Sequence, residues 1–289
     1  MIRFDIKTGE WKEFNPSGIC NWGMWIQQGY VGGPLPFDTA TIAWVNAVVT
    51  NGGTVSTPRK SLVNSLILNL KSTGIWQKLD RLWLLAAENT QSSLTDLVGL
   101  SLATAVGAPT FTTDRGYAGQ DAASPTAYLD LGFNLATQAV HYTLNSAHAS
   151  LWSTTNHADI NGGDFLGATD GTNADLIEWY SGLFYGALNT ATLANVSLAS
   201  INGHNLTSRT SSAGENLYQN AMLLGTTSAV STVVPNADNF ALCFNNAGST
   251  IFGTANNFAM ISYGGSLSSG DVNNFYSALR TYMTQVGVP

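Results

Sequence analysis

Three acidic residues, Asp170, Asp175 and Glu178, surround the turn Gly-Thr-Asn at 171–173. Glycoside hydrolysis needs two carboxyl groups about 5–10 Å apart, one of them with a raised pKa. The same loop offers hard oxygen ligands for calcium through Asp170, Asn173 and Asp175, although its spacing differs from that of an EF-hand. Because Asp, Asn and Gly are also the common residues of tight turns, a plain turn is the alternative interpretation.

Two aromatic residues that follow this loop, Trp179 and Tyr180, are candidates for stacking on a sugar ring. Strand alternation predicts Ile177 and Trp179 on one face and Glu178 and Tyr180 on the other, so Trp179 is also a candidate for the core. The candidate ligand-binding residues are therefore Trp179, Tyr180, Asn173 and Asp175. Asp170 and Asp175 are weaker candidates for binding a metal ion.

Other catalytic signatures are absent from the sequence. It has no Gly-x-Ser-x-Gly motif, no Cys-His arrangement and no Gly-x-x-x-x-Gly-Lys phosphate loop. Its four histidines show no paired metal-ligand spacing and are expected to be structural or surface residues: His141, His148, His157 and His204. We therefore expect no catalytic residue and no cofactor, with calcium as the one cofactor left open.

The element expected to position these residues is a central strand at 146–153. Ala147, Ala149 and Leu151 alternate there with polar or aromatic residues, the period of two that sends successive side chains to opposite faces of a sheet. Short runs of the same type, separated by turn residues, predict a mainly β sandwich. These runs lie at 109–113, 127–131, 177–180, 196–201, 221–225, 240–244 and 258–263.

Two helices and a buried strand are predicted before these runs. The first helix covers 39–50 after the N-cap Asp38, and the second has Thr57 as its N-cap and Pro58 at its first helical position and ends at Gly74. The apolar run at 82–87 predicts a buried strand, although a helix is the alternative. The spacing within the first helix predicts these buried residues: Ile42, Val45 and Val49.

The end of the chain and one turn are also well marked. Ser268 and Asp271 form a pair that resembles a capping box and predict a closing helix up to Gly287. Asn202-Gly203 is a dipeptide of tight turns, and it predicts a hairpin between 199–201 and 204–206.

Charge is scarce and unevenly distributed. Asp, Glu, Lys and Arg make up 10% of the 289 residues, against a typical ~25%. Residues 1–81 carry eight basic and five acidic groups, whereas 82–289 carry three and thirteen, which together give the net charge of −7. The second part therefore lacks the basic surface that nucleic acid requires, and its polar surface suits an uncharged polar ligand.

The N-terminal residues 1–37 carry large rings among glycines and prolines. Such a segment has too little periodicity to fold alone, so we interpret it as an attachment arm, with an ordinary extension packed on its own domain as the alternative. Cys20 and Cys243 are two unrelated thiols or a disulfide across the chain. The aromatic residues proposed for the contact are Trp11, Phe14, Trp22, Trp25 and Tyr30.

The start of the chain and its hydropathy give no targeting signal. The first five residues have no apolar region of a signal peptide, and no run of about 18 uncharged apolar residues occurs. We expect a protein made in the cytoplasm, without signal peptide or membrane insertion.

The order of several segments resembles a known fold family. Phe-Thr-Thr-Asp-Arg-Gly-Tyr at 111–117 precedes Tyr-Leu-Asp-Leu-Gly-Phe-Asn at 128–134 and the central strand, and Phe-Ala-Met-Ile-Ser-Tyr-Gly-Gly at 258–265 precedes the helix that holds 275–283. This order resembles the concanavalin A-like, laminin-G-like jelly roll, in the version found in virion proteins of tailed bacteriophages and in prophages. The division that follows is an arm at 1–37, a small helical region at 38–104, and a jelly roll with a C-terminal helix at 105–289.

The resemblance implies a function in the virion. It implies a structural protein of a tail, fibre or capsid decoration, whose jelly roll adheres to host-surface glycan. Other virion proteins would be partners through the arm, and a homo-oligomer is expected. Two alternatives stay open, a decoration protein that binds only virion proteins and a glycoside hydrolase. Glucanases of this fold usually carry Glu-x-Asp-x-x-Glu on one strand; this sequence lacks that pattern, so we expect no enzyme.

Overall fold

A computed structural model describes residues 2–5, 10–13 and 37–289. Residues 1–36 form one unit by themselves, in which β1 (Ile2–Asp5) pairs with β2 (Glu10–Glu13) as an antiparallel hairpin. Trp11 lies in β2. The other proposed interface residues lie outside the described residues, as does Cys20: Phe14, Trp22, Trp25 and Tyr30.

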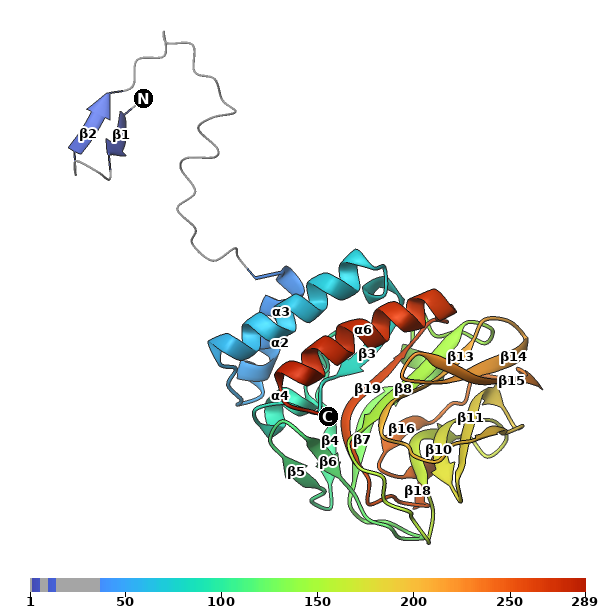
Figure 1. Cartoon of the computed structure of the whole chain (residues 1–289). Helices are drawn as coiled ribbons and strands as arrows, with labels where there is room; N and C mark the ends of the chain where they lie inside the picture. The colour runs from blue at the N-terminus through green and yellow to red at the C-terminus, as the bar shows by residue number, and fades with distance from the viewer. Residues whose placement is uncertain (1, 6–9, 14–36) are drawn as a thin grey trace. The chain divides into compact units, whose positions relative to one another are not determined.

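Two antiparallel sheets form a sandwich within residues 37–289 (Figure 1). The nine-stranded sheet has the order β12-β11-β10-β9-β16-β7-β4, and β17 and β18 join it beside β9, β17 in a short parallel pairing. Its strands are β4 (Thr104–Val106), β7 (Tyr128–Asn134), β9 (Asp164–Thr169), β10 (Ala174–Tyr180), β11 (Leu183–Thr190), β12 (Ala194–Ser197), β16 (Asp238–Ala241), β17 (Phe244–Asn246) and β18 (Ser249–Ile251).

The predicted central strand lies in the middle of the eight-stranded sheet. That sheet has the order β15-β14-β13-β8-β19-β6-β5, and β3 pairs with β19. These strands are β3 (Leu79–Trp83), β5 (Thr110–Thr112), β6 (Gly116–Ala118), β8 (Ala147–Ser153), β13 (Gly203–Arg209), β14 (Ala213–Gln219), β15 (Met222–Val230) and β19 (Asn257–Gly264). The mainly β sandwich predicted from the sequence is therefore confirmed.

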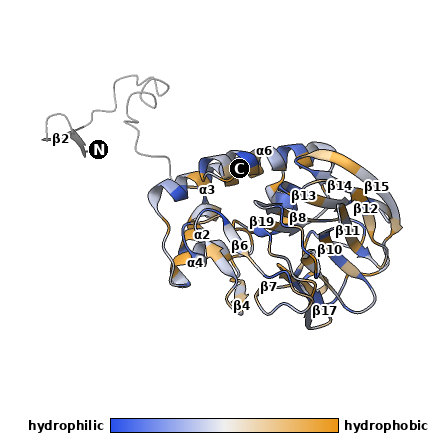
Figure 2. Cartoon of the chain, turned by 60° about the horizontal axis from the view of Figure 1, so that its bottom comes forward, coloured by the Kyte–Doolittle hydropathy of each residue, from blue (hydrophilic) through white to orange (hydrophobic). Residues whose placement is uncertain are grey.

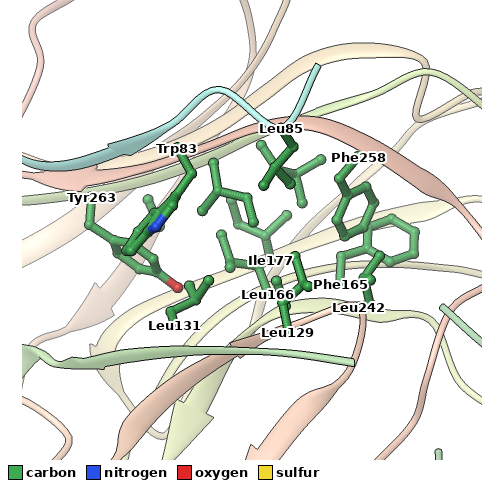
Figure 3. Packing of buried hydrophobic residues seen from close by; sticks show 14 of the residues in the cluster. Trp83, Leu85, Leu129, Leu131, Phe165, Leu166, Ile177, Leu242, Phe258 and Tyr263 are labelled. Carbon is green, nitrogen blue, oxygen red and sulfur yellow. The ribbon is translucent and has the colours of Figure 1, made fainter. Parts of the chain in front are cut away.

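Strand β8 is buried on both of its faces. Ala147, Ala149 and Leu151 belong to the core between the sheets, whereas Trp152 belongs to a second core on the outer side of the eight-stranded sheet. Figure 3 shows the core between the sheets, where Phe258 and Tyr263 of β19 meet side chains of the facing sheet. The alternation in the sequence thus separates two cores.

Helices cover the outer side of the eight-stranded sheet, as Figures 1 and 2 show from two directions. The capping box of α6 at Ser268 and Asp271 is confirmed. Within the described residues no helix is both long and apolar enough to cross a membrane. The helices are α2 (Thr39–Thr50), α3 (Thr57–Ser72), the 3-10 turn η1 (Trp76–Lys78), α4 (Thr90–Leu94), α5 (Leu135–Gln138) and α6 (Ser269–Gln285).

Two details of the helical predictions are wrong. The N-cap of α3 is Ser56, whose hydroxyl accepts from the Arg59 N–H, and not Thr57. In α2 the buried side consists of Thr41, Trp44 and Val48, whereas Ile42 and Val49 are exposed. Trp44 decides the orientation of α2, because its Nε1–H donates to the Thr95 carbonyl at 3.1 Å.

The predicted division between 38–104 and 105–289 does not separate two units. Residues 37–289 form one unit, and the run at 82–87 continues from β3, which pairs with β19. The helical region thus supplies a strand to the sandwich. Its helices share the outer core with α6, so the change of charge near residue 82 is not a domain boundary.

The predicted hairpin at Asn202-Gly203 is also wrong. The strand before it, β12, pairs with β11 in the nine-stranded sheet, whereas β13 after it pairs with β8 and β14 in the other. The dipeptide therefore lies in a connection between the two sheets. Gly203 has a φ of +100°, and a Cβ there would lie 2.2 Å from the Asn220 Oδ1, which explains why a glycine follows Asn202.

The outer core contains two fully buried histidines. The two ring nitrogens of His148 lie 2.6 Å from the Gly265 carbonyl oxygen and 3.2 Å from the Ser262 hydroxyl oxygen. Burial lowers the pKa of His148 to about 4, and it lowers the pKa of His204 to about 3 with a smaller contribution from His148. Both side chains are therefore neutral at pH 7.

We predict that Leu151→Asp unfolds residues 37–289. Leu151 is fully buried in the core between the sheets. An unpaired buried carboxylate costs several kcal/mol, against a typical total stability of about 5–15 kcal/mol. Leu68→Asp is the matched control, because Leu68 is 50% exposed on α3, and it should cost about 1 kcal/mol or less. Urea unfolding followed by circular dichroism measures both, and equal losses would contradict the assignment of the core.

We predict that His148 makes the protein less stable in acid. Its pKa is lowered to about 4 in the folded state. The contribution of His148 to the free energy of unfolding is therefore intact above pH 6.5 and is lost as the pH falls toward 4. Between pH 7 and pH 5 the loss is about 2 kcal/mol.

The test compares His148→Gln with the wild type at both pH values by urea unfolding. The comparison is needed because burial raises the pKa of Asp175 and Glu215, which shifts stability in the opposite direction. The variant should lose less stability between pH 7 and pH 5 than the wild type. His141→Gln, at an exposed position, should behave as the wild type, and an unchanged dependence in His148→Gln would contradict the prediction.

Candidate functional site

The predicted metal-binding loop is a tight turn in the structure. Asp170 lies between β9 and β10, and its Oδ1 accepts the N–H groups of Thr172 at 3.0 Å and Asn173 at 3.1 Å. These bonds lower the pKa of Asp170, and the Asn173 bond is the largest cause. Its carboxylate therefore serves the turn, as Asp does in many tight turns.

The other two residues of this loop are buried. Asp175 lies on the inward face of β10 and accepts the Tyr142 hydroxyl at 3.3 Å. Burial raises its pKa well above the usual range. Asn173 is also buried, and its Oδ1 accepts the hydroxyl of Thr232. The structure does not bring Asp170, Asn173 and Asp175 into one exposed site.

The aromatic pair after this loop is divided between two environments. Trp179 belongs to the core between the sheets, and its Nε1–H donates to the Leu198 carbonyl at 2.8 Å. Tyr180 is 42% exposed. Strand alternation predicts this division, and it leaves Tyr180 as an isolated ring without Trp179 beside it.

In the described part of the chain, another cluster could hold a metal ion. It consists of Asp121, His157 and Asp159, and one ligand atom from each residue lies within 4.8 Å of the other two. The carboxylate of Asp159 already accepts the Ala255 N–H at 2.9 Å, the Thr254 hydroxyl at 2.5 Å and the ring Nδ1 of His157 at 2.9 Å. Its oxygens are therefore occupied by hydrogen bonds within the protein.

A pocket of about 180 Å³ lies where α6 meets the ends of β8 and β13. It joins residues from four distant parts of the chain. Its lining residues are Trp152, Ser153, Thr154, Asn202, Gly203, Asn220, Tyr276, Arg280 and Pro289.

Three nearly parallel rings pack together beside this pocket, and two of them, Trp152 and Tyr276, belong to its lining residues. Trp152 lies 5.8 Å from Tyr276 and 6.0 Å from His204 between ring centroids, with interplanar angles of 7° and 14°. His204 lies 6.3 Å from Tyr276 at 7°. We call these three residues the aromatic platform. Phe275 supports it from below, because its ring meets His204 edge-on at 5.4 Å.

Strand register explains why the platform forms. Trp152 and His204 are Cα partners in the β8–β13 pairing, so both side chains point to the outer face of the sheet. Tyr276 reaches them from α6. Two of the platform's buried nitrogens, the Nε1 of Trp152 and the Nε2 of His204, have no hydrogen-bond partner among the described residues.

Amide and hydroxyl groups surround the platform. Asn202 and Asn220 are exposed, and the Oδ1 of Asn220 is fixed by the His204 N–H at 2.9 Å. Ser153 and Thr154 add hydroxyl groups at the end of β8. The rim therefore offers neutral donors and acceptors that tight backbone turns hold in place.

Arg280 closes one side of the pocket. It lies one helical turn after Tyr276, and its Cζ is 5.3 Å from the centroid of the Trp152 ring. Its Nε donates to the Thr284 hydroxyl at 3.0 Å and its Nη2 to the Val288 carbonyl at 2.7 Å. These bonds hold the guanidinium against the platform.

The lining of this pocket includes no Asp or Glu side chain. General acid–base chemistry on a sugar needs such carboxyl groups. The pocket therefore offers no pair of side-chain carboxyl groups. The sequence analysis missed this site because its parts lie far apart in the chain, and the one available signal was Trp152 on the polar face of the central strand.

No protein-family model matches this sequence, and no curated protein matches it by sequence. Several solved structures are similar in fold. A crystal structure of an HCR/D mutant has a TM-score of 0.53 at 10% identity, over 71% of this chain and 53% of that one. A mutant of Trypanosoma rangeli sialidase that displays trans-sialidase activity has a TM-score of 0.54 at 9% identity, over 78% and 40%.

A third similar structure is the botulinum neurotoxin serotype D binding domain, with a TM-score of 0.50 at 11% identity, over 71% of this chain and 52% of that one. The chain thus spans about half or less of these proteins. At such low identity the likeness concerns the fold. Residues 37–289 share the β-sandwich architecture of these structures.

Proposed function

We propose that this protein is a non-catalytic saccharide-binding protein and that the pocket beside α6 is its binding site. The observation that carries the proposal is the half-buried ring of Tyr276, which lines a pocket with amides and hydroxyl groups and is held there by the parallel rings of the buried Trp152 and His204. A sugar ring has an apolar face that packs on aromatic rings and hydroxyl groups that bond to neutral polar side chains.

The size of the pocket fits one sugar residue. Its volume of about 180 Å³ corresponds to about six waters at ~30 Å³ each.

The similar folds are compatible with this proposal. One of them is a sialidase and another is the binding domain of a neurotoxin. A sandwich of this architecture therefore occurs in a protein that acts on sugar and in one that binds a target, which supports but does not assign the same use here.

The proposal includes the absence of catalysis. Among the described residues, three buried carboxyl groups have raised pKa values, those of Asp96, Asp175 and Glu215, and none of them lines the pocket. A hydrolase would need such groups beside the sugar. The hydrolase alternative therefore lacks its two carboxyl groups at this site.

A second role, as a subunit of an assembly, rests on the aromatic residues in 1–37. Residues 1–36 of this segment form a unit separate from residues 37–289. Its five proposed contact residues have large rings that bury about 150–250 Å² each when covered. The place of the protein in a virion follows from the sequence resemblance and stays a prediction.

We predict that Tyr276→Ala weakens saccharide binding at least tenfold. The substitution removes one ring of the platform, and the loss of a central aromatic contact typically costs about 2 kcal/mol. A glycan array of the full chain selects the ligand, and calorimetry then measures its affinity. Tyr180→Ala, which removes the exposed ring that the sequence suggested, is the matched control and should bind as the wild type. Loss of binding in Tyr180→Ala alone would place the site at β10 instead.

We predict that a chain of residues 37–289 folds but does not assemble. Its two cores lie within this unit. Light scattering compares its mass with that of the full chain, and thermal unfolding serves as the control for folding. A shortened chain that forms the same oligomer would show that the arm is not the contact, and a monomeric full chain would contradict the expected homo-oligomer.

A further inference from the structure

Arg280 differs from the other basic residues of the acidic part of the chain. Residues 82–289 contain three basic side chains and thirteen acidic ones. Arg209 is paired with Glu215 at 2.7 Å, and Arg115 donates to the carbonyl oxygens of Asp114 and Val286. In the described part of the chain, neither Arg115 nor Arg280 forms an ion pair within 4.0 Å, and of the two only Arg280 lines the pocket.

The surroundings of Arg280 leave part of its guanidinium group available. Nε and Nη2 are bound to Thr284 and Val288, and the plane of the group is held near the Trp152 ring. No hydrogen bond of Nη1 is formed with the described residues. A guanidinium that is fixed in this way recognises carboxylates with little loss of side-chain entropy.

The charge of the pocket agrees with this recognition. Its lining side chains are neutral except for Arg280. His204 adds no positive charge, because burial lowers its pKa to about 3. The net charge of the sequence is −7, which disfavours a free carboxylate over the protein as a whole, whereas Arg280 supplies a positive charge at the pocket.

We propose, building on the saccharide-binding function above, that the pocket selects an acidic sugar, one that carries a carboxylate, and that Arg280 is the residue that determines this specificity. The sugar ring lies against the half-buried Tyr276 while its carboxylate pairs with the guanidinium group. The surface composition alone predicts an uncharged ligand. We expect an anionic one instead, because the positive charge of Arg280 at the pocket affects a bound ligand more than the composition of the rest of the surface does.

The experiment uses three pairs of oligosaccharides that end in glucuronic, galacturonic or N-acetylneuraminic acid, each with a twin whose carboxyl group is reduced to an alcohol. Calorimetry with the full chain measures all six affinities. In at least one pair the acid should bind tenfold or more tightly than its twin, and the difference should shrink as salt rises.

Variants separate this role from a structural one. Arg280→Gln should reduce the ratio of the acid's affinity to the twin's affinity to less than twofold, and Arg280→Lys should retain part of the preference. Lys60→Gln removes an equal charge on α3, away from the lining residues, and should keep the full preference. Thermal unfolding of each variant confirms that it is folded.

Two outcomes would overturn the inference in distinguishable ways. If the reduced twins bind as tightly as the acids in every pair, the pocket binds sugar without selecting a charge, and only the role of Arg280 is wrong. If none of the six sugars binds and the glycan array shows no other ligand, the saccharide-binding function itself is wrong.

Discussion

The eight-stranded sheet is buried on both faces, and the arrangement of residues 37–289 depends on this double burial. One face meets the other sheet, and the second needs a cover of its own. The helices α2, α3 and α6 supply that cover although they come from opposite ends of the chain. Arg59 fastens them, since its guanidinium group bonds to the Ala86 carbonyl, to the Tyr282 hydroxyl and to Asp114. Separating the helices from the sheet would expose both β8 and α6.

Burial on both faces also places charge inside the protein. Arg209 lies on the inner face of β13, where it donates to Glu215 and to the carbonyl oxygens of Leu188 and Ala229. Burial raises the pKa of Glu215 to about 7 even beside this arginine. Such a pair adds little net stability, because desolvation offsets most of its attraction. Removing only one partner would leave an unpaired buried charge, so the pair specifies how the two sheets meet.

The sequence predicts the parts of this fold that local chemistry determines. The capping pair of α6 and the alternation of β8 are correct because each depends on residues close in sequence. Of strand β13 the sequence predicts only 204–206, as one side of a hairpin. Its inner face is polar, with Asn205, Thr207 and Arg209 opposite the apolar residues of β8, so no hydrophobic period marks its full length. The predicted site at 170–175 does not form, because Asp175 lies on the inward face of β10 and bonds to Tyr142. Which face of β10 points inward depends on the facing sheet, which comes from other parts of the chain.

The pocket is a consequence of the same constraint and could not be predicted from one segment. Alternation sends Trp152 and His204 to the outer face, where α6 covers them with Phe275 and leaves Tyr276 and Arg280 at the margin of the contact. The rings at the pocket are therefore ordered by the packing of the core before any ligand arrives. Binding at such a site loses little side-chain entropy, so a small pocket with few contacts can still select its ligand.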